Sequence, residues 1–70
     1  MEKIEFQLKE EYIELIKLLK LVRIAESGGQ AKLFVENGEV RLNREVEHRK
    51  RAKLKKNDLV EIFEFQILIK

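Results

Sequence analysis

The spacing of apolar residues changes twice along this chain, and this change most limits the folds that the chain can adopt. Near the start, Ile4, Phe6 and Leu8 alternate with polar residues, which predicts a strand with one buried face. The next apolar residues recur at helical spacing and predict a first helix over about residues 12–21. The final segment, "LVEIFEFQILIK", alternates again. Its change of phase at residues 62–63 indicates a bulge or a strand that changes direction.

The segment "ESGGQAKLFVENGEV" carries the signals of a second short helix, over about residues 28–37. Ser27 and Gln30 have the spacing of a capping box, in which the serine hydroxyl accepts from the Gln30 backbone and the glutamine side chain returns to the serine N–H. Gly38 stands where glycine often ends a helix, because it adopts the left-handed conformation without a steric clash.

The remaining segments predict turns and strands. "EVRLNREVE" indicates a tight hairpin with Asn43 at a positive-φ position followed by Arg44, and "KKND" indicates another turn. Strand, helix, helix, hairpin, basic segment and strand together predict an α+β fold, with two short helices packed on a small, mostly antiparallel sheet. Residues 1–70 are expected to form one domain, because so short a chain can bury only one core.

Composition argues against several functions. There is no cysteine, which excludes disulfides, thiolate metal sites and thiol catalysis. The start lacks the apolar core of a signal peptide, no apolar run could span a bilayer, and a small domain without disulfides is expected in the cytoplasm. Ser27, His48 and Asp58 could be nominated as a catalytic triad, but a helix cap, a surface histidine and a turn aspartate explain them more simply. We expect no enzymatic activity, no cofactor and no metal.

The stretch "HRKRAKLKK", residues 48–56, concentrates the positive charge. Six of the eight residues from Arg49 to Lys56 are basic, whereas acidic residues outnumber basic ones in the rest of the chain. Ala52 and Leu54 interrupt the charge at a spacing that lets one face pack. We therefore expect a folded surface with Leu54 buried, and not a disordered tail. A local positive potential of this kind attracts a polyanion.

The start of the second helix is a further place where a phosphate could approach. Ser27, Gly28 and Gly29 would present backbone N–H groups at the positive end of the helix dipole, with Lys32 one turn further on. An ordinary capped helix start is the alternative interpretation. The five aromatic residues fall mostly on apolar stripes and are expected in the core, so a base-stacking sheet is not expected.

The segment from residue 13 to residue 62 resembles the RNA-binding domain family named after ribosomal protein S-four, whose core is an αL motif. The positions that match the family pattern are Leu15, Lys17, Leu18, Leu19, Ser27, Ala31, Lys32, Gly38, Val40, Leu42, Asn43 and Asp58. "SGG-x-AK" together with "RKR-x-KL" looks closest to the small stand-alone bacterial members, the YaaA/YbcJ-like group. The chain departs from the pattern at Glu14, where the family commonly has arginine or another polar residue, and at Arg44, which replaces a hairpin glycine.

The resemblance implies a stand-alone bacterial module that binds structured RNA, such as ribosomal or transfer RNA, through the second helix and the strands after it. It also suggests a monomer that associates with the ribosome or its assembly intermediates. The residues expected to contact RNA are Ser27, Gly28, Gly29, Lys32, Arg41, Asn43, Arg44, Arg49, Lys50, Arg51, Lys53, Lys55 and Lys56. Two alternatives stay open: a protein-interaction adaptor with an exposed strand edge, and DNA binding through the same basic patch.

Overall fold

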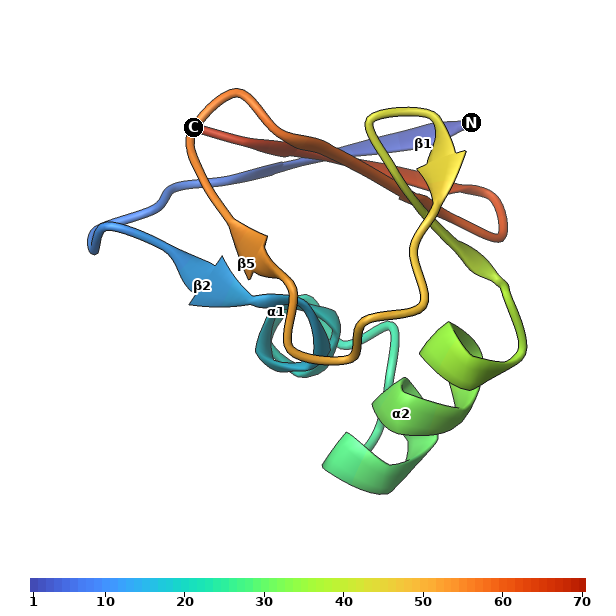
Figure 1. Ribbon diagram of the computed structural model, residues 1–70. Coiled ribbons are helices and arrows are strands. Elements are labelled where there is room, and N and C mark those ends of the chain that lie inside the picture. The colour runs from blue at the N-terminus through green and yellow to red at the C-terminus, as the bar shows by residue number, and fades with distance from the viewer.

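The computed structural model describes residues 1–70, which form seven strands and two helices. In chain order these are β1 (Glu2–Phe6), β2 (Ile13–Glu14), α1 (Leu15–Leu21), α2 (Gly28–Glu36), β3 (Val40–Leu42), β4 (Glu45–Val46), β5 (Lys53–Leu54), β6 (Leu59–Ile62) and β7 (Phe65–Ile69). Five strands form one sheet in the order β1-β7-β6-β3-β4, and β2 and β5 form a separate antiparallel pair. Both helices lie on the same side of the large sheet (Figure 1). The predicted α+β fold is confirmed.

The large sheet is antiparallel except at one edge. There β1 pairs parallel with β7, so the first and last strands of the chain lie side by side. The core lies between this sheet and the helices, and every buried residue is apolar: Leu8, Ile13, Leu15, Leu18, Leu19, Ala25, Ala31, Val35, Val40, Ala52, Leu54, Val60, Ile62, Ile67 and Ile69. Neither helix has the length and apolar composition that crossing a membrane requires.

The first helix begins at Leu15, three residues later than predicted. The two residues of β2 are extended instead, because they pair with the two residues of β5. Helical spacing of apolar residues cannot reveal a ladder partner that lies so far along the chain. The correction also moves Tyr12 out of the helix and onto the surface, where 39% of it is exposed.

The second helix matches its prediction over nearly its whole length, and only one detail of its capping differs. The Ser27 hydroxyl accepts from the Gln30 backbone N–H at 3.1 Å, as predicted. The Gln30 side chain, however, accepts from the backbone N–H of Glu26 at 2.6 Å, and not from that of Ser27. At the other end Gly38 has a φ of 73°, and its N–H donates to the carbonyl of Val35. This is the glycine-terminated helix end that the sequence indicated.

Two tight turns reverse the chain within the large sheet. Asn43 and Arg44 both have positive φ, 51° and 74°, which is the type I′ geometry of a two-residue hairpin and confirms the predicted turn. Phe63, with a φ of 53°, begins a second reversal between β6 and β7. The change of phase at residues 62–63 is therefore a complete change of strand direction and not a bulge.

The prediction that the aromatic residues lie in the core holds for three of the five, because Phe6, Phe34 and Phe65 pack against the core. None of the five is fully buried: Tyr12 and Phe63 are exposed, and Phe6, Phe34 and Phe65 are half-buried. Phe63 packs edge-on against Phe34, with 5.0 Å between the ring centroids. The prediction is wrong for Tyr12 and Phe63, because Tyr12 precedes β2 and Phe63 lies in the turn between β6 and β7, outside the strands and helices that enclose the core.

Candidate nucleic-acid interface

The basic run is held against the N-terminus of α1 by its own backbone. The Leu15 N–H donates to the Ala52 carbonyl at 2.9 Å, and the Ile16 N–H donates to the Lys50 carbonyl at 3.2 Å. These N–H groups have no partner inside the helix, so the basic run caps α1. Ala52 and Leu54 are 3% and 0% exposed. The predicted burial of Leu54 is confirmed.

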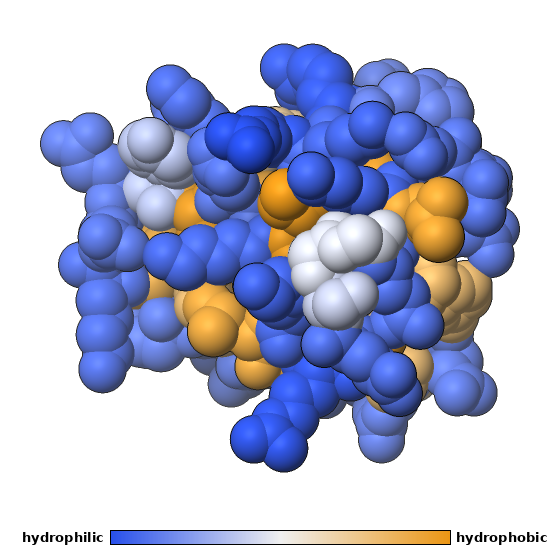
Figure 2. Space-filling model, turned by 90° about the horizontal axis from the view of Figure 1, so that it is seen from below, coloured by the Kyte–Doolittle hydropathy of each residue, from blue (hydrophilic) through white to orange (hydrophobic).

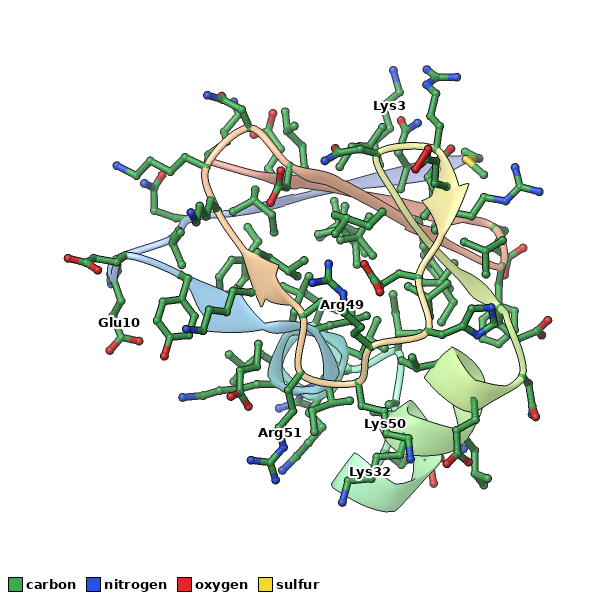
Figure 3. The ribbon with its side chains drawn as sticks, viewed as in Figure 1. Lys3, Glu10, Lys32, Arg49, Lys50 and Arg51 are labelled. Carbon is green, nitrogen blue, oxygen red and sulfur yellow. The ribbon has the colours of Figure 1, made fainter.

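The carbonyls of Lys50 and Ala52 in this loop turn toward α1, and the Lys50 side chain lies toward α2. The Lys50 ammonium forms an ion pair of 2.5 Å with Glu36, near the end of α2. Arg51 is exposed and extends to the same lower side of the molecule as Lys32 of α2 (Figure 3). The fold therefore brings a cation of the basic run and the predicted helix cation to one face.

Arg49 makes its contacts within the protein. Its guanidinium donates two hydrogen bonds of 3.0 Å to the two carboxylate oxygens of Glu47, and its backbone N–H donates a third of 2.9 Å. The side-chain hydrogen bond from Arg49 is the main reason that the pKa of Glu47 lies below its ordinary value. The same hydrogen bond raises the pKa of the Arg49 guanidinium. Arg49 and Glu47 thus form a bidentate ion pair at the start of the basic run.

The start of α2 leaves backbone donors free. The N–H groups of Gly28 and Gly29 donate to no acceptor in the protein, whereas the Gln30 N–H is taken by the Ser27 hydroxyl. A Cβ atom added at Gly29 would meet only the Ser27 hydroxyl, at 3.8 Å, and the glycine has no positive φ. Neither packing nor backbone conformation requires glycine there, and the absence of side chains lets an anion approach the N–H groups.

Lys20 is a further cation at this helix start, and it is not among the residues that the sequence predicted to contact RNA. A Cβ atom added at Gly28 would lie 3.9 Å from the Lys20 Cδ, so the stem of this lysine passes beside the first residue of α2. Only the packing of α1 on α2 reveals this position, and no local sequence signal could have found it. Seen from below, hydrophilic residues cover most of this face, and apolar residues show only in small separate areas (Figure 2).

The second half of the basic run lies beside acidic residues. The Lys53 ammonium lies over the Tyr12 ring, 4.8 Å from its centroid. Lys55 and Lys56 border the same shallow hollow as Lys9, Glu10 and Glu11 of the loop after β1. Carboxylates thus lie near Lys55 and Lys56 and reduce the positive potential there.

The cations of the β3–β4 hairpin lie elsewhere. The hairpin turn is at the top of Figure 1, and the start of α2 is at the bottom, with the sheet between them. Arg41 projects from the outer face of the sheet, opposite Glu61 of β6. The structure thus divides the predicted patch in two and does not bring Arg41, Asn43 and Arg44 to the face of Lys32. Their role as RNA contacts stays a prediction.

The Asn43 side chain is used within the fold. It donates to an Asp58 carboxylate oxygen at 3.1 Å and accepts from the Leu59 backbone N–H at 2.9 Å. The second Asp58 oxygen accepts from the Lys55 N–H at 2.8 Å. Asn43 and Asp58 therefore tie the hairpin turn to the turn that follows the basic run.

The structure does not assemble a catalytic triad. The Ser27 hydroxyl caps α2, whereas the Asp58 carboxylate accepts from the Asn43 side chain and the Lys55 N–H in the turn after the basic run. His48 packs beside Gly38, where an added Cβ atom would lie 3.8 Å from its ring. No group of three or more histidine, cysteine, aspartate or glutamate side chains is arranged to hold a metal ion.

Comparisons with known proteins agree with this architecture. A family model described as the S4 domain matches residues 6–70. YbcJ of Escherichia coli (strain K12) is 46% identical over 46 residues, and the match spans 66% of each chain, just under two thirds. RlbA of Bacillus subtilis (strain 168), named as a probable ribosome maturation protein, is 44% identical over 52 residues, which are 74% of this chain and 73% of RlbA.

A solved structure resembles this fold as well. The solution structure of E. coli YbcJ superposes with a TM-score of 0.67 and 37% sequence identity, over 91% of this chain and 85% of YbcJ. That structure is described as revealing an αL motif involved in RNA-binding.

Proposed function

Because this chain belongs to the S4 domain family, we propose that it is an RNA-binding module that recognises structured RNA by its phosphates and its shape. One observation carries the proposal. The free N–H groups of Gly28 and Gly29 lie at the start of α2, at the bottom of Figure 1, and Lys32 and the exposed Arg51 extend to the same lower side in Figure 3. The αL motif ascribed to YbcJ, a candidate RNA-binding protein by its name, supports RNA as the ligand.

The chemistry of this face suits a phosphate backbone. The positive end of the α2 dipole and two backbone N–H groups favour an anion, and Lys32 and Lys20 add charge beside them. The bases of A-form RNA lie in a deep, narrow groove that side chains cannot read, so contacts with phosphates and sugars dominate. We therefore expect affinity to depend on the shape of the RNA more than on its sequence.

The name of RlbA supports a more specific target. A relative named for ribosome maturation favours ribosomal RNA, or an assembly intermediate of the ribosome, as the ligand of this chain. Transfer RNA is the second choice, because it offers the same phosphate spacing. A cytoplasmic location and a monomeric state stay predictions.

A role as a strand-pairing adaptor has less support from the structure. The edges of the large sheet are β1 and β4. β4 has only two residues, and the side chains of β1 include Glu2, Lys3 and Glu5. Short or charged edge strands discourage pairing with another chain. Binding to DNA through the same phosphates is an outcome that the experiment below can detect.

The test is a binding titration with labelled RNA and with DNA of the same sequence, repeated at several salt concentrations. For about four to six phosphate contacts, log K should fall with log salt at a slope of roughly −3 to −5 on a duplex. A slope near zero would remove phosphate contact as the source of binding. Equal affinity for DNA would instead show that the face does not distinguish the two backbones.

A further inference from the structure

Tyr12 lies where two unlike surfaces meet. It directly precedes β2, it is 39% exposed, and the Lys53 ammonium covers its ring at 4.8 Å from the centroid. On one side of the β2–β5 pair, a hollow is lined by Arg49, Arg51, Ala52, Lys53 and Lys55. On the other side, a hollow of about 490 Å³ is lined by Glu10, Glu11, Tyr12, Ile13, Glu14 and Lys17. Figure 3 shows Glu10 and Arg49 on opposite sides of this pair.

A single nucleotide could match both surfaces, because it has an anionic phosphate at one end and a neutral base at the other. Its phosphate is an anion and suits the hollow lined by Arg51 and its basic neighbours. Its base is neutral and planar, and adenine, guanine and cytosine each carry an exocyclic amino group. The glutamates beside Tyr12 repel a phosphate, but their carboxylates can accept hydrogen bonds from base amino groups. A nucleotide that spans Lys53 would therefore place its phosphate on the basic side and its base beside the tyrosine ring.

We propose that Tyr12 is a stacking platform for one unpaired base of the bound RNA, and that Lys53 covers this ring in the free protein. An exposed cation–π contact is weak, so Lys53 can exchange it for a contact with an arriving phosphate. The ring face that Lys53 leaves is then available to a base, and bases stack on aromatic side chains in many RNA-binding modules. The inference rests on the proposed RNA-binding function and adds that the ligand carries an unpaired nucleotide next to its helix.

The protein contains a built-in probe for this contact. Tyr12 is the only tyrosine and there is no tryptophan, so tyrosine fluorescence reports on this one ring. The experiment compares a fully paired RNA duplex with the same duplex carrying one bulged adenosine. We expect both RNAs to bind, and the bulged RNA to bind about 5-fold to 150-fold more tightly, the range for one stacked base. Tyr12 fluorescence should be quenched by the bulged RNA much more than by the paired duplex.

Two variants separate the ring from the charge. Tyr12→Leu should lose the preference for the bulged RNA while keeping its affinity for the paired duplex, and Tyr12→Phe should keep both. Lys53→Gln should bind both RNAs more weakly and keep the preference for the bulge. Thermal unfolding of each variant should match that of the unaltered protein, because both side chains are exposed.

The outcomes are distinguishable from failure of the proposed function. Binding of both RNAs with equal affinity and equal quenching would overturn the stacking platform and leave RNA binding intact. A bulge preference that survives in Tyr12→Leu would do the same. If neither RNA binds at low salt, the proposed function fails, and the platform fails with it.

Discussion

The two helices of this protein begin in opposite ways. The first N–H groups of α1 donate to carbonyls of the basic run, so that helix start is closed by the protein itself. The first N–H groups of α2, at Gly28 and Gly29, have no protein acceptor and carry no side chain. The closed start holds the basic loop in place, and the open start is the one that can receive an anion. Both features are helix N-termini. The N-terminus of α1 supports the fold because the protein covers it, and the N-terminus of α2 can bind a ligand because the protein leaves it uncovered.

Leu54→Ala should produce the largest effect, because it destabilises the segment that covers the N-terminus of α1. Leu54 is fully buried and pairs with Ile13 in the ladder that leads into α1. Loss of its side chain should lower the free energy of unfolding by about 2–4 kcal/mol, through the cavity that remains. Denaturant unfolding measures this change. Weaker RNA binding by a sample that is still fully folded would contradict the division between scaffold and site.

Removing the cations around the open start should weaken binding without unfolding. For Lys32→Ala combined with Arg51→Ala we expect affinity to fall on the order of tenfold or more, and the salt slope to shrink by about two. Stability should change by less than about 0.5 kcal/mol, because both side chains are exposed. Arg41→Ala combined with Arg44→Ala is the matched control at the hairpin. An equal loss in the control would show that the hairpin cations also contact RNA.

Gly29→Glu tests the open start directly. A carboxylate near the helix N-terminus suits the dipole, so stability should stay unchanged or rise slightly. The same charge would repel a phosphate, and we expect RNA affinity to fall on the order of tenfold. The space around Gly29 admits a side chain, so a loss of fold is not expected. Gly29→Ala is the control, and normal binding by both variants would reduce this helix start to an ordinary cap.

Glu47→Gln should have the smallest effect, and in the opposite direction. It removes the carboxylate that holds Arg49 and so frees one cation. RNA affinity should rise by a few-fold, with a salt slope steeper by about one. Unchanged affinity in an electrophoretic binding assay would mean that Arg49 stays within the protein even when it is released.

The same pair predicts a pH dependence of stability. The pKa of Glu47 is lowered in the folded state, so its stabilising contribution is present above the ordinary glutamate pKa of about 4.3. That contribution is lost as the pH falls further, through the lowered pKa of the folded protein. The stability difference between the unaltered protein and Glu47→Gln should therefore be present at neutral pH and disappear in acid. A difference that persists in acid would contradict the ion pair as its source.

Much of this architecture could be predicted from local signals. The second helix, its serine cap and its terminal glycine depend on residues within one or two turns of each other. The Asn43–Arg44 hairpin and the burial of Leu54 follow from nearby polar and apolar alternation. These features are visible in the sequence because the interactions that form them are short in range.

The features that the sequence did not predict share one cause: each depends on contacts between residues that are far apart in the sequence. The start of α1, the exposure of Tyr12 and the position of Lys20 depend on segments brought together only by folding. The separation of the β3–β4 hairpin, which carries Arg41 and Arg44, from the start of α2 has the same cause, because the fold decides which segments lie close together. Whether these two cations contact RNA stays a prediction.

The sequence by itself determined three features of the protein: a basic run anchored by a buried leucine, a glycine-rich helix start and an α+β fold. Only the tertiary structure decided which charges act together. The sequence shows which residues neighbour each cation along the chain. The electrostatic effect of a cation, however, depends on its distances to carboxylates and helix ends, and packing sets those distances. Packing paired Arg49 with Glu47 and Lys50 with Glu36, and it left Arg51 exposed on the same lower side of the molecule as Lys32.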